Sequence, residues 1–310
     1  MNFLWPIHLI YGAGLFAIGT IVGSFLNVCI YRIPWEKSVI WPGSHCPSCL
    51  AAIPARDNIP VLGWLMLRGA CRGCGTQISP RYPAVELLVG LLFLAVYLVD
   101  AVFTTDFVRD DLALFVRVLD HVLLVSLLVV ITFIDADLTI VPGSITNLGI
   151  VAGLALGTIF PEIRPQPSAA LTAWGGLWAG LQGLIVGAGL IQFVRVVGGF
   201  VFRREAMGSG DIHILGMIGA FLGWQAAVLT FFLAPFFGFL PAIWKLSVFL
   251  GKKWSGRKSL STDRELPFGP FLALAALTLM FSWRWSWPGF AKYYFETLSV
   301  LFWFLLGQGF

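Results

Sequence analysis

The sequence has few charged residues. Only 12% of its 310 residues are Asp, Glu, Lys or Arg, whereas 58% are hydrophobic. Soluble domains carry about 25% charged residues, so this composition excludes an ordinary soluble domain. A helix crosses the hydrocarbon core of a bilayer, about 30 Å, with about 20 mainly apolar residues. Because the chain contains many such runs, we predict an all-α polytopic membrane protein with about eight transmembrane helices.

Other features are missing as well. The chain has no basic patch of the kind that binds nucleic acid, so we expect no nucleic-acid partner. No Lys or Arg precedes the first apolar run, and no small-residue cleavage site leads into a soluble domain; we therefore expect a retained first span and not a signal peptide. No glycine-rich dinucleotide fingerprint follows a predicted strand.

The apolar runs divide the chain into a first span, a polar segment and a series of further spans. Residues 9–31 form the first run, and residues 32–83 have the composition of a soluble segment. The run at 212–222 is short for a full span, which favours a helix that stays inside the protein. The other expected spans are 84–99, 118–134, 145–160, 173–194, 226–250, 268–281 and 293–306.

The distribution of Lys and Arg predicts an orientation. The connections 32–83, 195–211 and 251–266 together hold fourteen of these residues, against five on the opposite side, which include Arg117 and Arg164. Cytoplasmic loops carry the excess of positive residues. We therefore expect the polar segment to face the cytoplasm and the N-terminus to lie outside.

Four of the five cysteines form two CxxC pairs in the polar segment: Cys46 with Cys49, and Cys71 with Cys74. Two such pairs can give four thiolates to one tetrahedral Zn²⁺, and a small segment with little apolar content needs a staple of this kind to fold. Redox disulfides and an iron site are the alternatives. A structural disulfide is disfavoured on the cytoplasmic side. We predict a small cytoplasmic zinc-binding segment after the first helix, with one structural zinc per chain.

Five acidic residues lie in or beside predicted spans, where a carboxylate is costly. For Glu86 and Asp120 we expect solvated or dipole-stabilised helix ends. Asp137 is expected either in a loop or as a carboxylate that supports the reacting groups without reacting itself. Asp135 ends one apolar run, and Asp211 directly precedes the run at 212–222, so both lie at the cytoplasmic mouth of the bundle. Two facing aspartates can share a proton and hydrolyse a peptide, although independent structural roles are an alternative.

The motifs together resemble the type IV prepilin peptidase family, the leader peptidases and N-methyltransferases of type IV pilus and type II secretion systems. The resemblance runs over most of the chain, and the ordered combination of motifs is highly specific. The motifs are Gly23-Ser-Phe-Leu-Asn-Val28, Tyr31-Arg-Ile-Pro34, Ser44-His-Cys-Pro-Ser-Cys49, Asp57-Asn-Ile-Pro60, Leu67-Arg-Gly-Ala-Cys-Arg-Gly-Cys74, Arg81-Tyr-Pro-Ala-Val-Glu-Leu-Leu88, Phe133-Ile-Asp-Ala-Asp137, Gly208-Ser-Gly-Asp211 and Leu266-Pro-Phe-Gly-Pro-Phe271.

The resemblance implies that Asp135 and Asp211 are the catalytic pair of an aspartyl intramembrane protease in the bacterial inner membrane. Such an enzyme cleaves prepilins and pseudopilins on the cytoplasmic side, after the glycine that ends a short basic leader. It then methylates the new N-terminal amine from S-adenosylmethionine. The expected domains are residues 1–31 (first transmembrane helix), 32–83 (tetracysteine segment and methyltransferase region) and 84–310 (transmembrane peptidase domain).

The methyl-donor site is less well defined by the motifs. The end of the first span reaches the cytoplasm, so its residues Gly23, Ser24 and Asn27 are weak candidates for this site. For Gly23 and Ser24, a role in close packing between helices is an equally good explanation. Gly143 stands where the family often has an acidic residue, and His213 where a Lys often follows the aspartate. Neither departure changes a residue of the acidic pair; both concern the tuning of that pair by its surroundings.

Two other classes of protein fit part of the pattern. A transporter would use intramembrane acids for ions and should show broken helices in both halves of an internal repeat, but no clear repeat is present. A non-catalytic scaffold of a secretion assembly would tolerate loss of the two aspartates. Each of these interpretations places the protein in contact with membrane lipid. The sequence does not predict an oligomeric state.

Overall fold

The computed structural model describes residues 5–103, 111–164, 172–203, 207–254 and 267–287, together with positions 293, 297 and 300. These residues are mainly helical and form no strand, so the all-α prediction is confirmed for them. The expected span at 293–306 lies outside the described residues apart from those three positions. The helices are α1 (Trp5–Arg32), α2 (Leu62–Met66), α3 (Arg81–Tyr97), α4 (Asp111–Leu138), α5 (Gly143–Ile159), α6 (Ala173–Phe202), α7 (Ser209–Leu222), α8 (Trp224–Trp254) and α9 (Gly269–Ser286).

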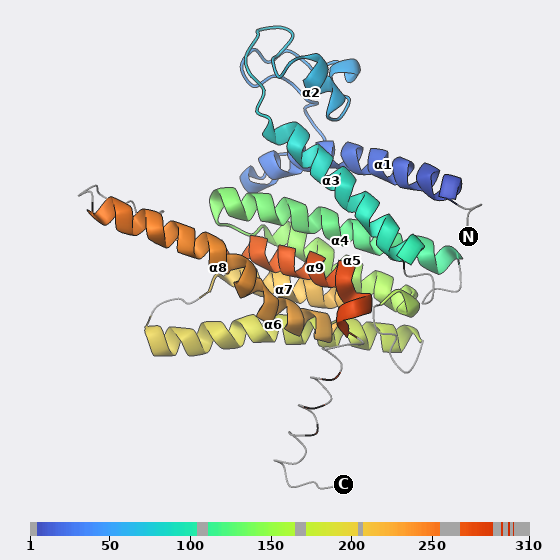
Figure 1. Ribbon diagram of the computed structural model, residues 1–310, viewed down its shortest axis with the longest axis vertical. Coiled ribbons are helices and arrows are strands. Elements are labelled where there is room, and N and C mark those ends of the chain that lie inside the picture. The colour runs from blue at the N-terminus through green and yellow to red at the C-terminus, as the bar shows by residue number, and fades with distance from the viewer. Residues whose placement is uncertain are drawn as a thin grey trace.

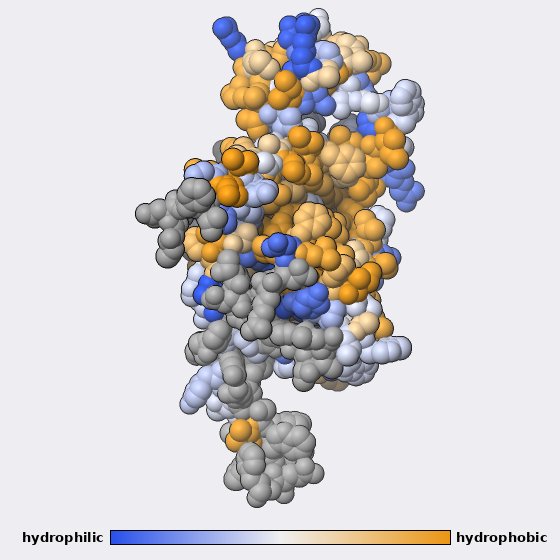
Figure 2. All heavy atoms as spheres, turned by 90° about the vertical axis from the view of Figure 1, so that its right-hand side faces the viewer, coloured by the Kyte–Doolittle hydropathy of each residue, from blue (hydrophilic) through white to orange (hydrophobic). Residues whose placement is uncertain are grey.

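Five of these helices are long and apolar enough to cross a membrane: α1, α3, α4, α6 and α8. Their outer faces carry large hydrophobic side chains exposed to the surroundings, such as Ile10 on α1 and Phe193 on α6. Figure 2 shows extensive hydrophobic surface on one face of the helical part. α7 has 14 residues and is shorter than a full span, as its short apolar run predicts.

The helices lie roughly side by side, with α4 between the α1–α3 pair and the helices that follow it in the chain (Figure 1). α1 packs against α3 on one side of α4, while α5 and α9 contact α4 on the other. α7 lies among α5, α6, α8 and α9 and buries nearly all of its length. The polar segment between α1 and α3 contains only the short helix α2 and two 3₁₀ turns, and it projects beside the α1–α3 pair.

Glycines bring α6 and α7 into close contact. A Cβ atom on Gly183 of α6 would strike the carbonyl oxygen of Gly219 on α7, and a Cβ on Gly219 would strike that of Gly183. Gly187, one turn further along α6, meets the backbone of Leu215 in the same way. Small residues allow helices in a membrane to pack backbone against backbone. These contacts fix the position of α7, which carries Asp211.

A buried polar cluster lies about 20 Å along α4 from Asp135. Asp100 contacts His121 at 2.6 Å and Arg117 at 3.3 Å, and Asp120 and Arg164 are each 4% exposed. The expected solvated helix end at Asp120 is therefore wrong. Arg117, within α4, and Arg164, in the connection after α5, are buried as well, so neither is an exposed loop charge.

Candidate functional site

The structure brings Asp135 and Asp211 together. Asp135 lies in the last turn of α4 and Asp211 in the first turn of α7, and these two helices pack on each other. Their side chains are buried, with exposed fractions of 5% and 7%. The two carboxyl groups lie within electrostatic range of each other. Two carboxylates from distant parts of the sequence thus share one buried site.

Backbone groups surround both carboxylates. The amide of Gly269, the first residue of α9, donates to Asp135 Oδ2 at 3.0 Å. Gly208 precedes α7 in an extended conformation and provides a backbone hydrogen bond to Asp211. Gly210 has no room for a Cβ, because Val141 lies against it. Two buried carboxyl groups that interact can hold a single proton, which leaves one group as base and the other as acid.

Asp137 has a different environment from Asp135. It is half exposed and accepts a hydrogen bond from Arg81 at 2.6 Å. The guanidinium of Arg81 also lies 5.0 Å above the ring of Phe133. The start of α3 is therefore tied to the last turn of α4, the turn that carries Asp135.

The four cysteines of the polar segment form one cluster. The sulfur atoms of Cys46, Cys49, Cys71 and Cys74 all lie within 4.8 Å of one another. Two of the distances are 3.8 Å, between Cys46 and Cys74, and 4.0 Å, between Cys49 and Cys71. Four thiolates at about 2.3 Å from a tetrahedral Zn²⁺ are about 3.8 Å apart. The cluster therefore has the donors and the dimensions to hold a metal ion.

Each CxxC pair sits in a tight turn closed by backbone hydrogen bonds. The amide of Cys46 donates to the carbonyl of Ala51, and the amide of Cys71 donates to that of Thr76, both at 2.9 Å. The contact of the Cys74 thiol with the Thr76 hydroxyl lowers the pKa of Cys74 to about 6. This shift favours the thiolate, which is the form that binds metal.

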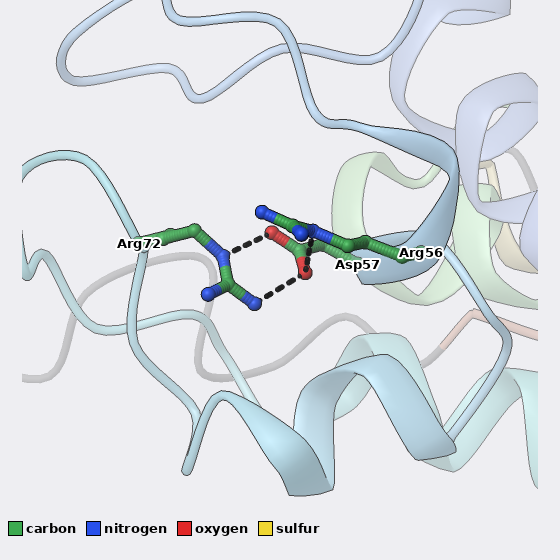
Figure 3. A network of polar contacts seen from close by, with 3 residues as sticks. All are labelled: Arg56, Asp57 and Arg72. Atoms are coloured by element: carbon green, nitrogen blue, oxygen red, sulfur yellow. Dashed lines mark hydrogen bonds and ion pairs between the residues drawn. The ribbon is translucent and has the colours of Figure 1, made fainter.

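An ion pair braces the second turn (Figure 3). Arg72 donates from Nε and Nη2 to the two carboxylate oxygens of Asp57, at 2.7 Å each. Arg56 faces the same carboxylate at 3.9 Å and is largely exposed. The hydrogen bonds from Arg72 hold the pKa of Asp57 below its usual value. The pair ties the second cysteine turn to the 3₁₀ turn Ala55–Asp57, a contact that spacing alone did not predict.

Contacts with α1 and α3 attach the polar segment to the bundle. Glu86 of α3 accepts a hydrogen bond from the amide of Val61 at 2.7 Å, so it is not simply a solvated helix end. The Asn27 side chain of α1 donates to the carbonyl of Tyr82 at 3.1 Å. Gly23 lies against the backbone of Glu86 with no space for a Cβ. Asn27 and Gly23 thus serve the packing of α1 on α3, and Ser24 between them is partly buried.

The two positions that depart from the family pattern lie on the surface. Gly143 begins α5 and is exposed, and His213 is exposed on α7, two residues after Asp211.

Comparison with known proteins gives a consistent result. The model of the bacterial peptidase A24 N-terminal domain matches residues 17–99, and that of the type IV leader peptidase family matches residues 122–243. A prepilin leader peptidase/N-methyltransferase of Myxococcus xanthus is 38% identical over 280 residues, which cover 90% of this chain and 74% of that protein. Proteins of the same name from Klebsiella pneumoniae (36% identical; 75% of this chain and 91% of that protein) and Aeromonas hydrophila (31%; 86% and 89%) are also similar. No solved structure matches the chain.

Proposed function

Because this chain belongs to the type IV leader peptidase family, we propose that it cleaves the leaders of prepilins and methylates the new N-terminus. Its similar relatives carry both activities in their names. These relatives do not favour a transporter or a non-catalytic scaffold. The observation that carries the peptidase role is the buried pair of Asp135 and Asp211, which α4 and α7 bring together.

We assign the cleavage to this pair. One carboxylate takes a proton from a water molecule as the water oxygen attacks the carbonyl carbon of the scissile peptide bond. The other carboxyl group gives its proton to the departing amine nitrogen as the carbon–nitrogen bond breaks. Gly208 leaves space for an extended substrate backbone beside Asp211, whereas Val141 occupies the space at Gly210.

Loop charge supports an orientation with the acidic pair at the cytoplasmic face of the bacterial inner membrane. By sequence, fourteen Lys and Arg residues fall in or next to the connections expected on the side of Asp135 and Asp211. In this orientation the N-terminus lies outside, and pseudopilins as well as prepilins present their leaders from the cytoplasm. The chain then divides into the first span at 1–31, the segment 32–83 and the peptidase domain at 84–310.

We propose that the cysteine cluster holds one structural Zn²⁺. Four thiolates close the coordination sphere, so the ion stabilises the segment and takes no part in peptide cleavage. S-adenosylmethionine, when bound, supplies the methyl group. We place methylation in segment 32–83 and the adjoining end of α1, and Gly23, Ser24 and Asn27 contribute to it as part of that packed end.

Substitution of the acidic pair tests the peptidase assignment. Asp135→Asn and Asp211→Asn should each abolish leader cleavage of a purified prepilin while the protein still inserts into the membrane. Asp111→Asn is the matched control, because Asp111 is an exposed acid at the opposite end of the same helix. Near-normal cleavage by either Asp135→Asn or Asp211→Asn would refute the pair.

Metal analysis tests the role of the cysteine cluster. Purified protein should contain one zinc per chain, and Cys46→Ser should lose zinc and methylation of a cleaved pilin but retain leader cleavage. Cys29→Ser serves as the control, since Cys29 is buried in α1 outside the cluster. Full methylation by Cys46→Ser would show that the segment does not support that activity.

A further inference from the structure

The first residue of α9, Gly269, touches both helices of the acidic pair. α9 packs on α4 and on α7. The amide of Gly269 donates to Asp135 Oδ2 at 3.0 Å. On its other side lies Ile214, which follows Asp211 by one turn of α7 and is fully buried. The glycine therefore lies at the junction of three helices, directly behind one of the two carboxylates.

The start of α9 leaves one amide free for Asp135. The first N–H groups of a helix have no partner within the helix. Pro270 has no N–H. Phe271 and Leu272 donate to the carbonyl of Phe268, at 3.0 and 3.1 Å. The N–H of Gly269 is thus the donor that this turn directs at Asp135, and the positive end of the helix dipole favours a negative group there.

Only a glycine leaves the Asp135 carboxylate in this place. A Cβ on residue 269 would lie 2.5 Å from Asp135 Oδ2 and 3.0 Å from Ile214 Cδ1. Ile214 cannot yield easily, because its side chain has no exposed surface and close-packed cores resist added atoms. A side chain at 269 would therefore displace the Asp135 carboxylate from this position.

We propose that Gly269 is a positioning residue for leader cleavage, which sets the distance of Asp135 from Asp211 through its amide and its missing side chain. The inference rests on the proposed catalytic role of Asp135. It gives the Leu266-Pro-Phe-Gly-Pro-Phe271 motif a function: the glycine makes room for the carboxylate, and the proline after it removes a competing donor.

Kinetics of Gly269→Ala test this role. A displacement of a reacting group by about 1 Å can cost about 100-fold in rate, so kcat for cleavage should fall by that order with KM unchanged. Methylation of an already cleaved pilin should stay at the wild-type rate, which shows that the protein is folded. Gly189→Ala is the control: Gly189 is a helical glycine on α6, and a Cβ there meets no described atom within 4 Å. Wild-type cleavage by Gly269→Ala overturns the inference.

A double-mutant cycle covers the case in which Gly269→Ala folds poorly. Unfolding by sodium dodecyl sulfate in mixed micelles measures the stability lost through Gly269→Ala, with Asp135 present and with Asp135→Ala. The loss should be smaller in the Asp135→Ala background, because the carboxylate that the new Cβ strikes is gone. An equal loss in both backgrounds overturns the inference. If Asp135→Asn cleaves normally, the proposed function fails instead, which separates the two outcomes.

Discussion

Arg164 should be essential for the stability of the helical bundle although it lies far from the acidic pair. Its Nη1 atom donates to the carbonyls of Ala220 and Phe221 at 2.9 and 3.3 Å, and Nη2 donates to that of Gly153 at 3.4 Å. The last carbonyls of α7 have no partners within the helix. Arg164→Met keeps the apolar stem of the side chain but leaves these carbonyls buried without a donor.

The contacts set the expected magnitude. A hydrogen bond from a charged donor contributes about 1.5 to 3 kcal/mol. Counting only the two bonds to α7 at the lower figure, Arg164→Met should lower the free energy of unfolding by about 3 kcal/mol. Removing one member of a buried ionic network costs about 3 to 5 kcal/mol, which agrees.

Unfolding by sodium dodecyl sulfate in mixed micelles measures this loss. Arg164→Lys should fall between wild type and Arg164→Met, because a lysine keeps the charge but not the planar fork of donors. Arg56→Met is the control, since the Arg56 side chain is 73% exposed. A value for Arg164→Met within about 0.5 kcal/mol of wild type, the range of surface substitutions, would refute the reasoning.

Two further matched pairs follow from the contacts. Gly183→Ala should lose about 1 to 3 kcal/mol of stability by overpacking α6 against α7 and should slow cleavage, whereas Gly189→Ala on the same helix meets no described atom within 4 Å and should change neither. Equal effects would contradict the close-contact argument. Arg72→Met should speed zinc release to a chelator near neutral pH more than Arg56→Met. Because pairing lowers the pKa of Asp57, its stabilisation is fully present above about pH 4 and declines as pH falls below that value. The comparison is made near neutral pH, where the cysteine ligands still hold the metal; equal release rates from Arg72→Met and Arg56→Met would exclude this pair.

Local patterns were enough to predict the helices and the cysteine cluster. Hydropathy over a run of residues decides whether a helix can cross a bilayer, and two CxxC pairs place their sulfur atoms at short range. The meeting of Asp135 with Asp211 depends on how α4 packs on α7, which periodicity along one helix does not contain. That expectation came from the resemblance. In the motif Leu266-Pro-Phe-Gly-Pro-Phe271, the proline after Gly269 indicated the start of a helix. It did not indicate that Gly269 contacts Asp135.

The expectation for Asp120 failed for a related reason. A carboxylate near the end of an apolar run is solvated unless partners exist to permit its burial. One such partner of Asp120 comes from elsewhere in the chain, namely Arg164. In the same cluster, Asp100 of the π-helical turn Leu98–Phe103 pairs with Arg117 and His121 of α4. Hydropathy counts treat such residues as loop charges, because a single sequence does not show long-range pairing.

The contacts of Arg81 bear on how two reactions could follow each other on one chain. Arg81 begins α3 directly after the polar segment, and its ion pair with Asp137 holds it to the turn that carries Asp135. Segment 32–83 and the acidic pair therefore lie at the same end of the bundle. If cleavage takes place at Asp135 and Asp211, as we propose, the released amine arises near the first turn of α3, next to the segment in which we place methylation. Sequential processing then requires no movement of the new N-terminus across the membrane.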